Sequence, residues 1–204
     1  NAVYEALGLK QIESVTANNI SKVLSNSFSK QDLQLRVDKT NNNDIETSIL
    51  KDDKMVGFIT LTVKNGKVHI KITEVFDEFQ KQGIAENVYI EINRILQENS
   101  MGELNSDVEF LKDTKTEEWT LDGKILSKEK KKKITDDIDL LIELEEAGRL
   151  GKTEAVRPAV KLWEKLVRKG LAEKTETGYK FKSQITPQQK QQAQQLYSQY
   201  LDTI

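Results

Sequence analysis

Residues 76–87, "FDEFQKQGIAEN", place Gly83 in a short polar turn between an apolar-patterned strand and a segment with helical spacing. A turn of this kind leaves the first backbone N–H groups of the helix unpaired, at the positive end of the helix dipole. Gly83 would let a ligand come close to the backbone, and Ala85 keeps the neighbouring position small. The turn therefore suits a pyrophosphate, although a plain strand–helix connection could use the same residues.

Composition limits the other chemistries. The 204 residues contain no cysteine, which excludes disulfides, thiolate metal ligands and cysteine nucleophiles and fits a reducing compartment. His69 is the single histidine, so a metal site with several histidine ligands is impossible and no metal is expected. The formal net charge of −2 does not indicate a protein that binds polyanions over its whole surface. No apolar run is long enough to span a membrane, so no membrane association is expected.

The elements that would position this turn are a meander of strands followed by helices. Alternating polarity and many valines, isoleucines and threonines predict three strands, near 33–39, 46–50 with 55–63, and 67–75, with hairpin turns at "KDDK" and "KNGK". After the turn, a helical stripe is formed by Ile84, Val88, Ile92, Ile95 and Leu96. There follow a strand in "GELNSDVEFL", a helix in "SKEKKKKITDDIDLLIELEEAG", a helix in "VRPAVKLWEKLVRKG", a hairpin in "LAEKTETGYKFK" and a closing helix from Thr186. The predicted fold class is α+β, with a mixed, mostly antiparallel sheet and flanking helices.

Residues 75–89, "VFDEFQKQGIAENVY", resemble the coenzyme A-binding motif of the GNAT acetyltransferase superfamily. That motif has a strand valine, an acidic residue and an aromatic, then Arg or Gln, two residues, Gly, any residue, and Gly or Ala. The residues that match in order and spacing are Val75, Glu78, Phe79, Gln80, Gly83 and Ala85. The resemblance covers roughly residues 15–110 and 155–182. Within it, "NSDVEF" resembles the fifth strand of the family, which splays from the fourth to admit the pantetheine arm.

The resemblance implies acetyl-CoA as cofactor and N-acetyl transfer to an amine as the reaction. Val75 would offer backbone hydrogen bonds to pantetheine, and Asn105 and Asp107 would line the splayed cleft. The acceptor would be a small-molecule or peptide amine, whose identity the sequence does not reveal. The residues whose amides would bind the pyrophosphate are Gln80, Lys81, Gln82, Gly83, Ile84 and Ala85.

Two residues of the strand before the loop are candidates for the base that deprotonates the acceptor. Glu74 ends an otherwise apolar face formed by Val68, Ile70 and Ile72, close to where the thioester would lie. His69 falls, by its offset from the loop, where some family members keep a catalytic glutamate. Either side chain could instead be an ordinary exposed polar residue, and a water relay is a further alternative. Because acyl transfer is direct, positioning alone can supply part of the rate.

Two departures from the family pattern support an alternative function. Catalytic members usually have a tyrosine in the late helix, whose phenol protonates the leaving thiolate. Here it is Trp163, whose indole N–H is too weak an acid, and we interpret it as a core anchor. Residues 111–152 are also longer than the usual link, and we interpret them as an insertion with an extra hairpin or loop and a helix. The alternative is a GNAT-like module of low or no activity with a binding or structural role.

A second alternative is a winged-helix DNA reader, which the late helix and hairpin also resemble. Lys161, Lys165, Arg168 and Lys169 would then contact phosphates. The acidic helix that precedes them argues against this role. The run "SKEKKKK" is interpreted as a solvated helix start, because acidic residues follow it directly. Nucleic acid is therefore not an expected partner.

The two ends, "VYEALGLK" and "TPQQKQQAQQLYSQYLDTI", resemble connector segments of large multidomain proteins of phages and mobile elements. The expected organisation is a connector helix at 1–14, a GNAT-like domain at 15–182 that contains the insertion, and a C-terminal connector helix at 183–204. Neighbouring domains of a longer chain would be its partners. The expected location is the cytoplasm, that of the host cell for a phage protein.

Overall fold

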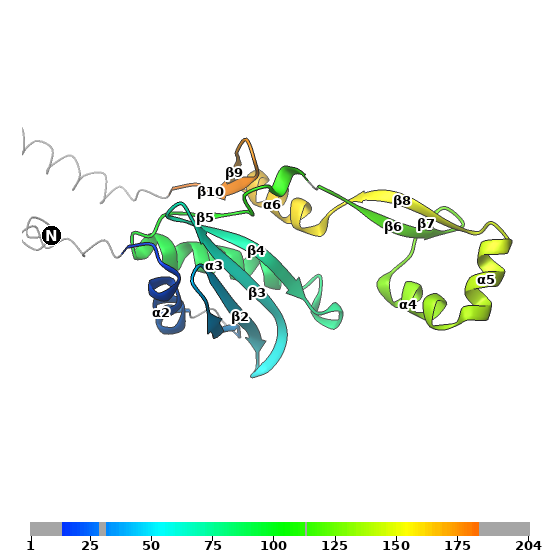
Figure 1. The fold of residues 1–204 in the computed structure, drawn as a ribbon, viewed down its shortest axis with the longest axis horizontal. Helices are drawn as coiled ribbons and strands as arrows, with labels where there is room; N and C mark the ends of the chain where they lie inside the picture. The colour runs from blue at the N-terminus through cyan, green and yellow to red at the C-terminus, as the bar shows by residue number, and fades with distance from the viewer. Residues whose placement is uncertain (1–13, 29–31, 113, 184–204) are drawn as a thin grey trace, which may run out of the picture.

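The structure is a computed structural model that describes residues 14–28, 32–112 and 114–183. A main body contains a seven-stranded sheet and three helices, and a smaller three-stranded sheet with two helices extends from it as an arm (Figure 1). The predicted α+β class, with a mostly antiparallel mixed sheet and flanking helices, is confirmed. The expected connector helices at 1–14 and 183–204 lie, apart from one residue of each, outside the described residues.

The predicted antiparallel meander is present, with four strands where three were expected. They are β1 (Gln34–Thr40), β2 (Asp44–Lys51), β3 (Lys54–Lys64) and β4 (Lys67–Val75). Hairpin turns of type I′ require positive φ at two consecutive residues, where Asn-Gly and Asp residues are favoured. Both predicted turns are confirmed, with positive φ at Asp52 and Asp53 and at Asn65 and Gly66.

The sheet continues through β5 (Leu104–Asn105), β10 (Tyr179–Phe181) and β9 (Ala172–Lys174), in the order β1-β2-β3-β4-β5-β10-β9. β5 runs parallel to β4, whereas the other described pairs of this sheet are antiparallel. The strand predicted in "GELNSDVEFL" is confirmed only at Leu104 and Asn105, the two of these residues that pair with β4. The Asp107 carboxylate accepts the N–H of Val108 at 2.7 Å, and this local bond turns the chain away from β4 into a 3-10 helix.

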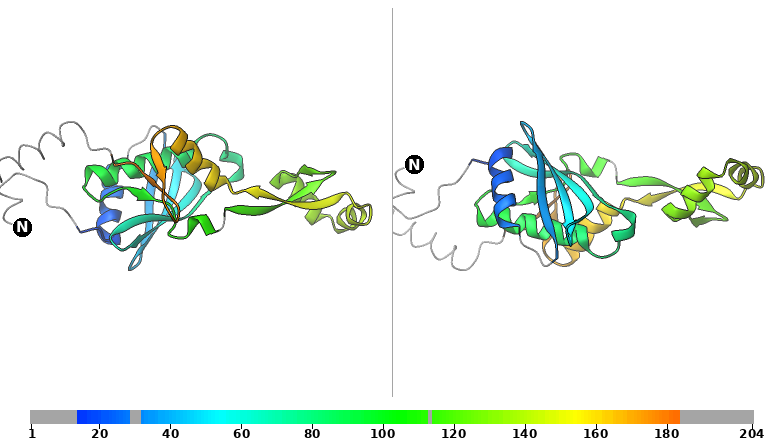
Figure 2. Two further views of the ribbon diagram at one scale, coloured as in Figure 1. Left: turned by 90° about the horizontal axis from the view of Figure 1, so that it is seen from above. Right: turned by 90° about the horizontal axis from the view of Figure 1, so that it is seen from below.

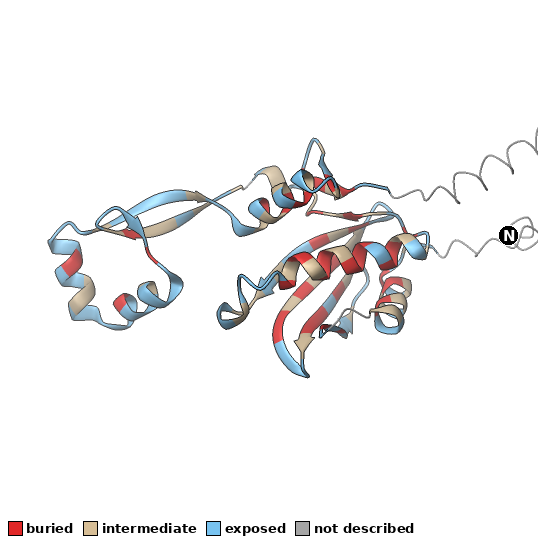
Figure 3. Ribbon diagram, turned by 180° about the vertical axis from the view of Figure 1, so that it is seen from behind, coloured by how far each residue is buried: buried red, intermediate tan, exposed pale blue. Residues whose placement is uncertain are grey.

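Three helices pack on the main sheet: α2 (Ala17–Ser27), α3 (Ile84–Glu98) and α6 (Pro158–Arg168). Seen from behind, the buried residues gather on α3 and on the strands that it covers (Figure 3). The predicted stripe on α3 is confirmed as core, because Ile84, Val88, Ile92, Ile95 and Leu96 are all buried. No helix in the described part of the chain is both long and apolar enough to cross a membrane.

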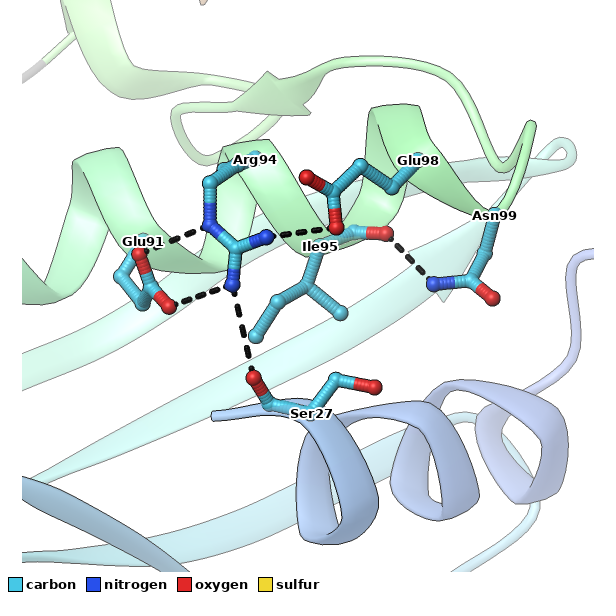
Figure 4. Close-up of polar contacts among 6 residues, drawn as sticks. All are labelled: Ser27, Glu91, Arg94, Ile95, Glu98 and Asn99. Carbon is cyan, nitrogen blue, oxygen red and sulfur yellow. Dashed lines mark hydrogen bonds and ion pairs between the residues drawn. The ribbon is translucent and has the colours of Figure 1, made fainter. Parts of the chain in front are cut away.

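Arg94 connects α3 to α2 (Figure 4). Its guanidinium donates two hydrogen bonds to the buried carboxylate of Glu91, at 3.0 and 2.6 Å, and one to Glu98 at 2.5 Å. A further N–H reaches the carbonyl oxygen of Ser27 at the end of α2, at 3.4 Å. Hydrogen bonds to Glu91 and then Glu98 raise the pKa of Arg94 above its usual range. The pair of carboxylates therefore holds the cation in place between the two helices.

The arm has its own small core. Its sheet has the order β7-β6-β8, from β6 (Lys115–Leu121), β7 (Lys124–Ile125) and β8 (Leu150–Val156). The segment interpreted as an insertion at 111–152 thus corresponds to residues 115–156. At the base of the arm, the N–H of Arg157 donates a hydrogen bond to the Thr114 carbonyl at 3.0 Å. The prediction of one helix was wrong: there are two, α4 (Lys128–Asp136) and α5 (Ile138–Glu146). Asp137 breaks the helix, because its extended backbone makes it the N-cap of α5, accepting the N–H of Leu140.

Candidate functional site

The loop between β4 and α3 presents free backbone donors. After the 3-10 helix η1 (Asp77–Phe79), Lys81 and Gly83 both adopt positive φ, of 62° and 74°. Gly83 is the N-cap of α3 and supplies no side chain to its first N–H groups. Among the described residues, none of the backbone N–H groups from 81 to 86 has a hydrogen-bond acceptor. The loop therefore has a cluster of N–H donors at the positive end of α3, which fits an anionic phosphate.

Side chains fix the shape of this loop. The Gln80 amide donates to the Val75 carbonyl at 3.0 Å and to the Asp77 carboxylate at 2.8 Å. Gln80 thus ties the loop to the end of β4. Three lysines from other segments also reach the loop: Lys51 donates to Gln82 at 3.2 Å, Lys54 pairs with Glu78 at 3.3 Å, and Lys128 of α4 pairs with Asp77 at 2.8 Å. Lys54 and Lys128 offset the charges of Glu78 and Asp77, and Lys51 adds a positive charge beside the free amides.

An open strand edge lies beside the loop. β4 and β5 pair only through Val68 with Leu104 and His69 with Asn105, so in the described chain β4 has no partner on this side beyond His69. The N–H of Phe76 bonds to Val56 on β3 at 2.9 Å. Because neighbouring residues of a strand direct their backbone groups to opposite sides, the backbone groups of Val75 and Thr73 point toward the open edge. The Val75 carbonyl accepts one hydrogen bond, from the Gln80 amide. The Val75 N–H has no acceptor among the described residues.

Thr73 was missed as a site residue from the sequence alone. It lies two residues before Val75 on the same edge, so the strand period of two could have identified it. Its hydroxyl accepts a hydrogen bond from the buried phenol of Tyr89, at 2.9 Å. Burial raises the pKa of Tyr89 to about 12, against the opposing effect of this bond, so the phenol stays protonated at physiological pH.

A β-bulge changes the faces expected along β4. The pairing with β3 shifts between Thr60 and Leu61, which lie opposite Ile72 and Ile70. The extra residue, Lys71, reverses the alternation that follows it. The prediction that Ile72 shares the apolar face of Val68 and Ile70 was therefore wrong: Val68 and Ile70 are buried, whereas Ile72 is 49% exposed.

His69 is oriented at the fork where β4 and β5 part. Its Nδ1 lies 2.8 Å from the carbonyl oxygen of Ser106. A carbonyl can only accept, so Nδ1 carries a proton, and in the neutral ring Nε2 is left as the basic nitrogen. Glu74 is exposed at the other end of the strand, near the loop. The structure thus gives one candidate base a fixed orientation and leaves the other in solvent.

The two residues expected in the cleft have structural roles at this fork. The Asn105 amide donates to the carbonyls of Val68 at 3.1 Å and Glu103 at 2.8 Å, which holds β5 against β4. The carboxylate of Asp107 accepts a hydrogen bond from the N–H of Val108. Asn105 therefore lies at the point where the strands separate, while Asp107 belongs to the turn that follows.

Trp163 is buried in an aromatic cluster at 1% exposure. It stacks on Tyr179 with an interplanar angle of 10°, and its ring centroid is 5.6 Å from Tyr89 and 5.5 Å from Phe181. The interpretation of Trp163 as a core anchor is confirmed by this burial. The hydroxyl of Tyr179 donates to Glu164 at 2.5 Å; burial, together with this carboxylate, raises the pKa of Tyr179 to about 12.

Glu86 joins α3 to α6, a role that the sequence did not indicate. Its nearly buried carboxylate accepts from the ammonium groups of Lys165 and Lys169. Burial raises the pKa of Glu86, but hydrogen bonds and charge from the two lysines outweigh burial and hold that pKa below its usual value. Both lysines are thereby engaged within the protein, and the hairpin after α6 joins the main sheet through β5. The winged-helix alternative thus lacks two of its phosphate contacts.

No protein-family model matches this sequence, and no curated protein does. A solved acetyltransferase resembles part of the chain. It is the IAA acetyltransferase from Bacillus cereus ATCC 14579, with 12% identity over 40% of this chain and a TM-score of 0.29. The chain spans 61% of that structure.

We expect Glu86→Gln to lower stability in a pH-dependent manner. The folded pKa of Glu86 is depressed, so its contribution is present above the unfolded pKa and is lost as the pH falls through the folded pKa. Urea unfolding should show the variant to be less stable than the wild type at neutral pH, with the difference closing in acid. Glu176→Gln, at an exposed position, is the control and should show no such difference. A gap that persists unchanged at low pH would contradict the assignment.

Proposed function

We propose that this chain binds acetyl-CoA along the loop and the open edge of β4, and transfers the acetyl group to an amine. The observation that carries the proposal is the run of unpaired amide N–H groups at 81–86, directly beside unpaired strand backbone at Thr73 and Val75. Such an arrangement suits a molecule with a diphosphate at one end and amide groups along an extended chain. Acetyl-CoA has this form, and when bound it would supply the activated acetyl thioester.

The length of β4 fits this assignment. From Val75 to His69 the strand spans roughly 20 Å at about 3.3 Å per residue. The loop amides would hold the phosphates, and the backbone groups of Val75 and Thr73 would bind the amide groups of the cofactor's pantetheine. His69 would then lie near the reacting end. With Nδ1 held by Ser106, Nε2 would take the proton from the acceptor ammonium.

The proton for the departing thiolate requires another donor, because Trp163 is a core residue. A thiol with a pKa of about 8.5 leaves readily, so water can serve. The phenol of Tyr89 is the protonated hydroxyl next to the strand edge, through its bond to Thr73.

The binding step is tested by calorimetric titration of the chain with acetyl-CoA and with CoA. Saturable binding of both is expected. Titrations with dephospho-CoA and with free pantetheine separate the contribution of the cofactor's phosphates from that of its pantetheine. No heat of binding for either cofactor would refute the proposal.

We expect a base variant to reduce transfer most at neutral pH. His69→Ala should lower the rate by about 10²–10⁴-fold, and by less at high pH, where the acceptor amine is already deprotonated. His69→Asn can still donate to Ser106 but has no basic nitrogen, so it separates orientation from proton transfer. Glu74→Gln tests the other candidate, with Glu46→Gln, at an exposed position of β2, as its control. The pH–rate profile decides between them: a profile unchanged in both His69 and Glu74 variants would leave only a water relay.

A second candidate function is a coenzyme-binding or structural module without activity. The observation that favours it is the aromatic cluster around Trp163, which provides no phenol from α6. Tight binding of CoA without transfer to any of a broad panel of small amines and peptides would establish this alternative.

A further inference from the structure

The arm carries two helices, α4 and α5, of which α4 contacts the main body through the Lys128–Asp77 ion pair. Figures 1 and 2 show a narrow extension with α5 at its far end. The helices join the arm core, whose buried hydrophobic residues in the described chain are Leu126, Ile134 and Leu144. A core of this size contributes little stability by itself, so the outer surfaces of the helices are the feature to explain.

Those outer surfaces carry opposite charges. α4 has five lysines and two acidic residues, whereas α5 has four acidic residues and no basic one. Although the helices are neighbours, no ion pair joins them in the part of the chain that the structure describes. The ion pairs of α4 are made by Lys133 with its own Glu129 and by Lys128 with Asp77 of the main body. The two charged surfaces therefore remain available to a partner.

The acidic helix also exposes apolar side chains. Ile138 and Ile142, one turn apart on α5, are 68% and 46% exposed. Ile125 on β7 of the same arm is 58% exposed. Three exposed isoleucines within one small unit are unfavourable in water, and a partner that covers them would remove that cost.

We propose that two copies of this chain associate through their arms, with α4 of each copy packed against α5 of the other. Each copy carries both halves of the contact, so a two-fold axis forms the lysine–carboxylate surface twice. The aliphatic stems of the α4 lysines can cover Ile138 and Ile142 while their ammonium groups reach the α5 carboxylates. This complementarity of charge within one sequence favours a second copy over an unrelated partner. The proposal does not depend on acetyl-CoA binding.

Charge reversal tests the association in the full chain. One variant, Glu143→Lys with Glu145→Lys and Glu146→Lys, makes both helices positive, and the other, Lys130→Glu with Lys132→Glu, makes both negative. All five positions are exposed and have no ion pair in the described structure. Sedimentation at low salt should show a concentration-dependent dimer for the wild type and a dissociation constant higher by about a hundredfold or more for each variant alone.

Mixing the two variants gives the decisive measurement. A heterodimer should form, because each positive helix then meets a negative one in both halves of the contact, and added salt should weaken it. Circular dichroism establishes that each variant is folded, and Glu176→Lys on the main body is the matched control that should leave the dimer intact. A monomeric wild type, a dimer that survives both reversals, or a mixture that stays monomeric would each overturn the proposal.

Discussion

Gly83→Glu should abolish CoA binding while leaving the protein folded. A Cβ at this position meets only the Asn87 side chain, at 3.8 Å, so the new side chain has room. It would extend into the space in front of the free amides and place a negative charge where the phosphates bind. Like charges brought together cost several kcal/mol, so the dissociation constant should rise by about a hundredfold or more.

The control for this prediction separates strain from electrostatics. Gly83 has a φ of 74°, which disfavours any residue with a Cβ. Gly66 has a φ of 69° in the hairpin between β3 and β4, and a Cβ added there would have open space within 4 Å. Gly66→Glu should thus have a similar stability cost but normal CoA affinity by calorimetry. Unchanged CoA affinity in a folded Gly83→Glu protein would end the coenzyme interpretation of the loop.

Gly57→Ala should destabilise the main sheet more than any other glycine replacement in β-structure. A Cβ on Gly57 would lie 2.2 Å from the carbonyl oxygen of Glu74 and 3.0 Å from the Cα of Val75. Both are backbone atoms of β4, so relief requires the two strands to separate. Overpacking of this kind costs about 3 kcal/mol or more, to be measured from urea unfolding.

The same substitution should weaken CoA binding, because the displaced segment of β4 ends at the loop. Gly151→Ala in the arm provides the comparison: its Cβ would lie 2.9 Å from the Thr120 hydroxyl, a side-chain atom that can rotate away. The free energy of unfolding of that variant should lie within about 1 kcal/mol of the wild-type value. If Gly57→Ala were equally harmless, the close approach of β3 and β4 would not be required for folding.

The loop and the meander could be predicted because their signals are local. Asn65-Gly66 specifies a tight hairpin by its backbone preferences, and Gly83 marks the entry to a helix whose apolar spacing is regular. The bulge at Lys71 could not be predicted, because Val68, Ile70 and Ile72 alternate without a break in the sequence. Pairing with β3 determines the faces there, and that pairing depends on residues far along the chain.

The fork between β4 and β5 was predicted only in outline for a related reason. Beyond Asn105 the backbone of the described chain bonds to β10 and not to the backbone of β4: the Ser106 N–H donates to the Tyr179 carbonyl at 2.8 Å, and the Ser106 hydroxyl accepts the Tyr179 N–H at 2.9 Å. These partners are separated by more than seventy residues. The orientation of His69 follows from the same segment, since its acceptor is the Ser106 carbonyl.

The separate cores of arm and main body imply two units that need not open together. Amides of the arm should become exchangeable through openings that leave the main sheet closed. The chain contains two tryptophans, and each core has one: Trp119 packs on the arm cluster and Trp163 on the main one. The protein thereby carries an intrinsic fluorophore in each unit, and replacing either one isolates the optical signal of the other.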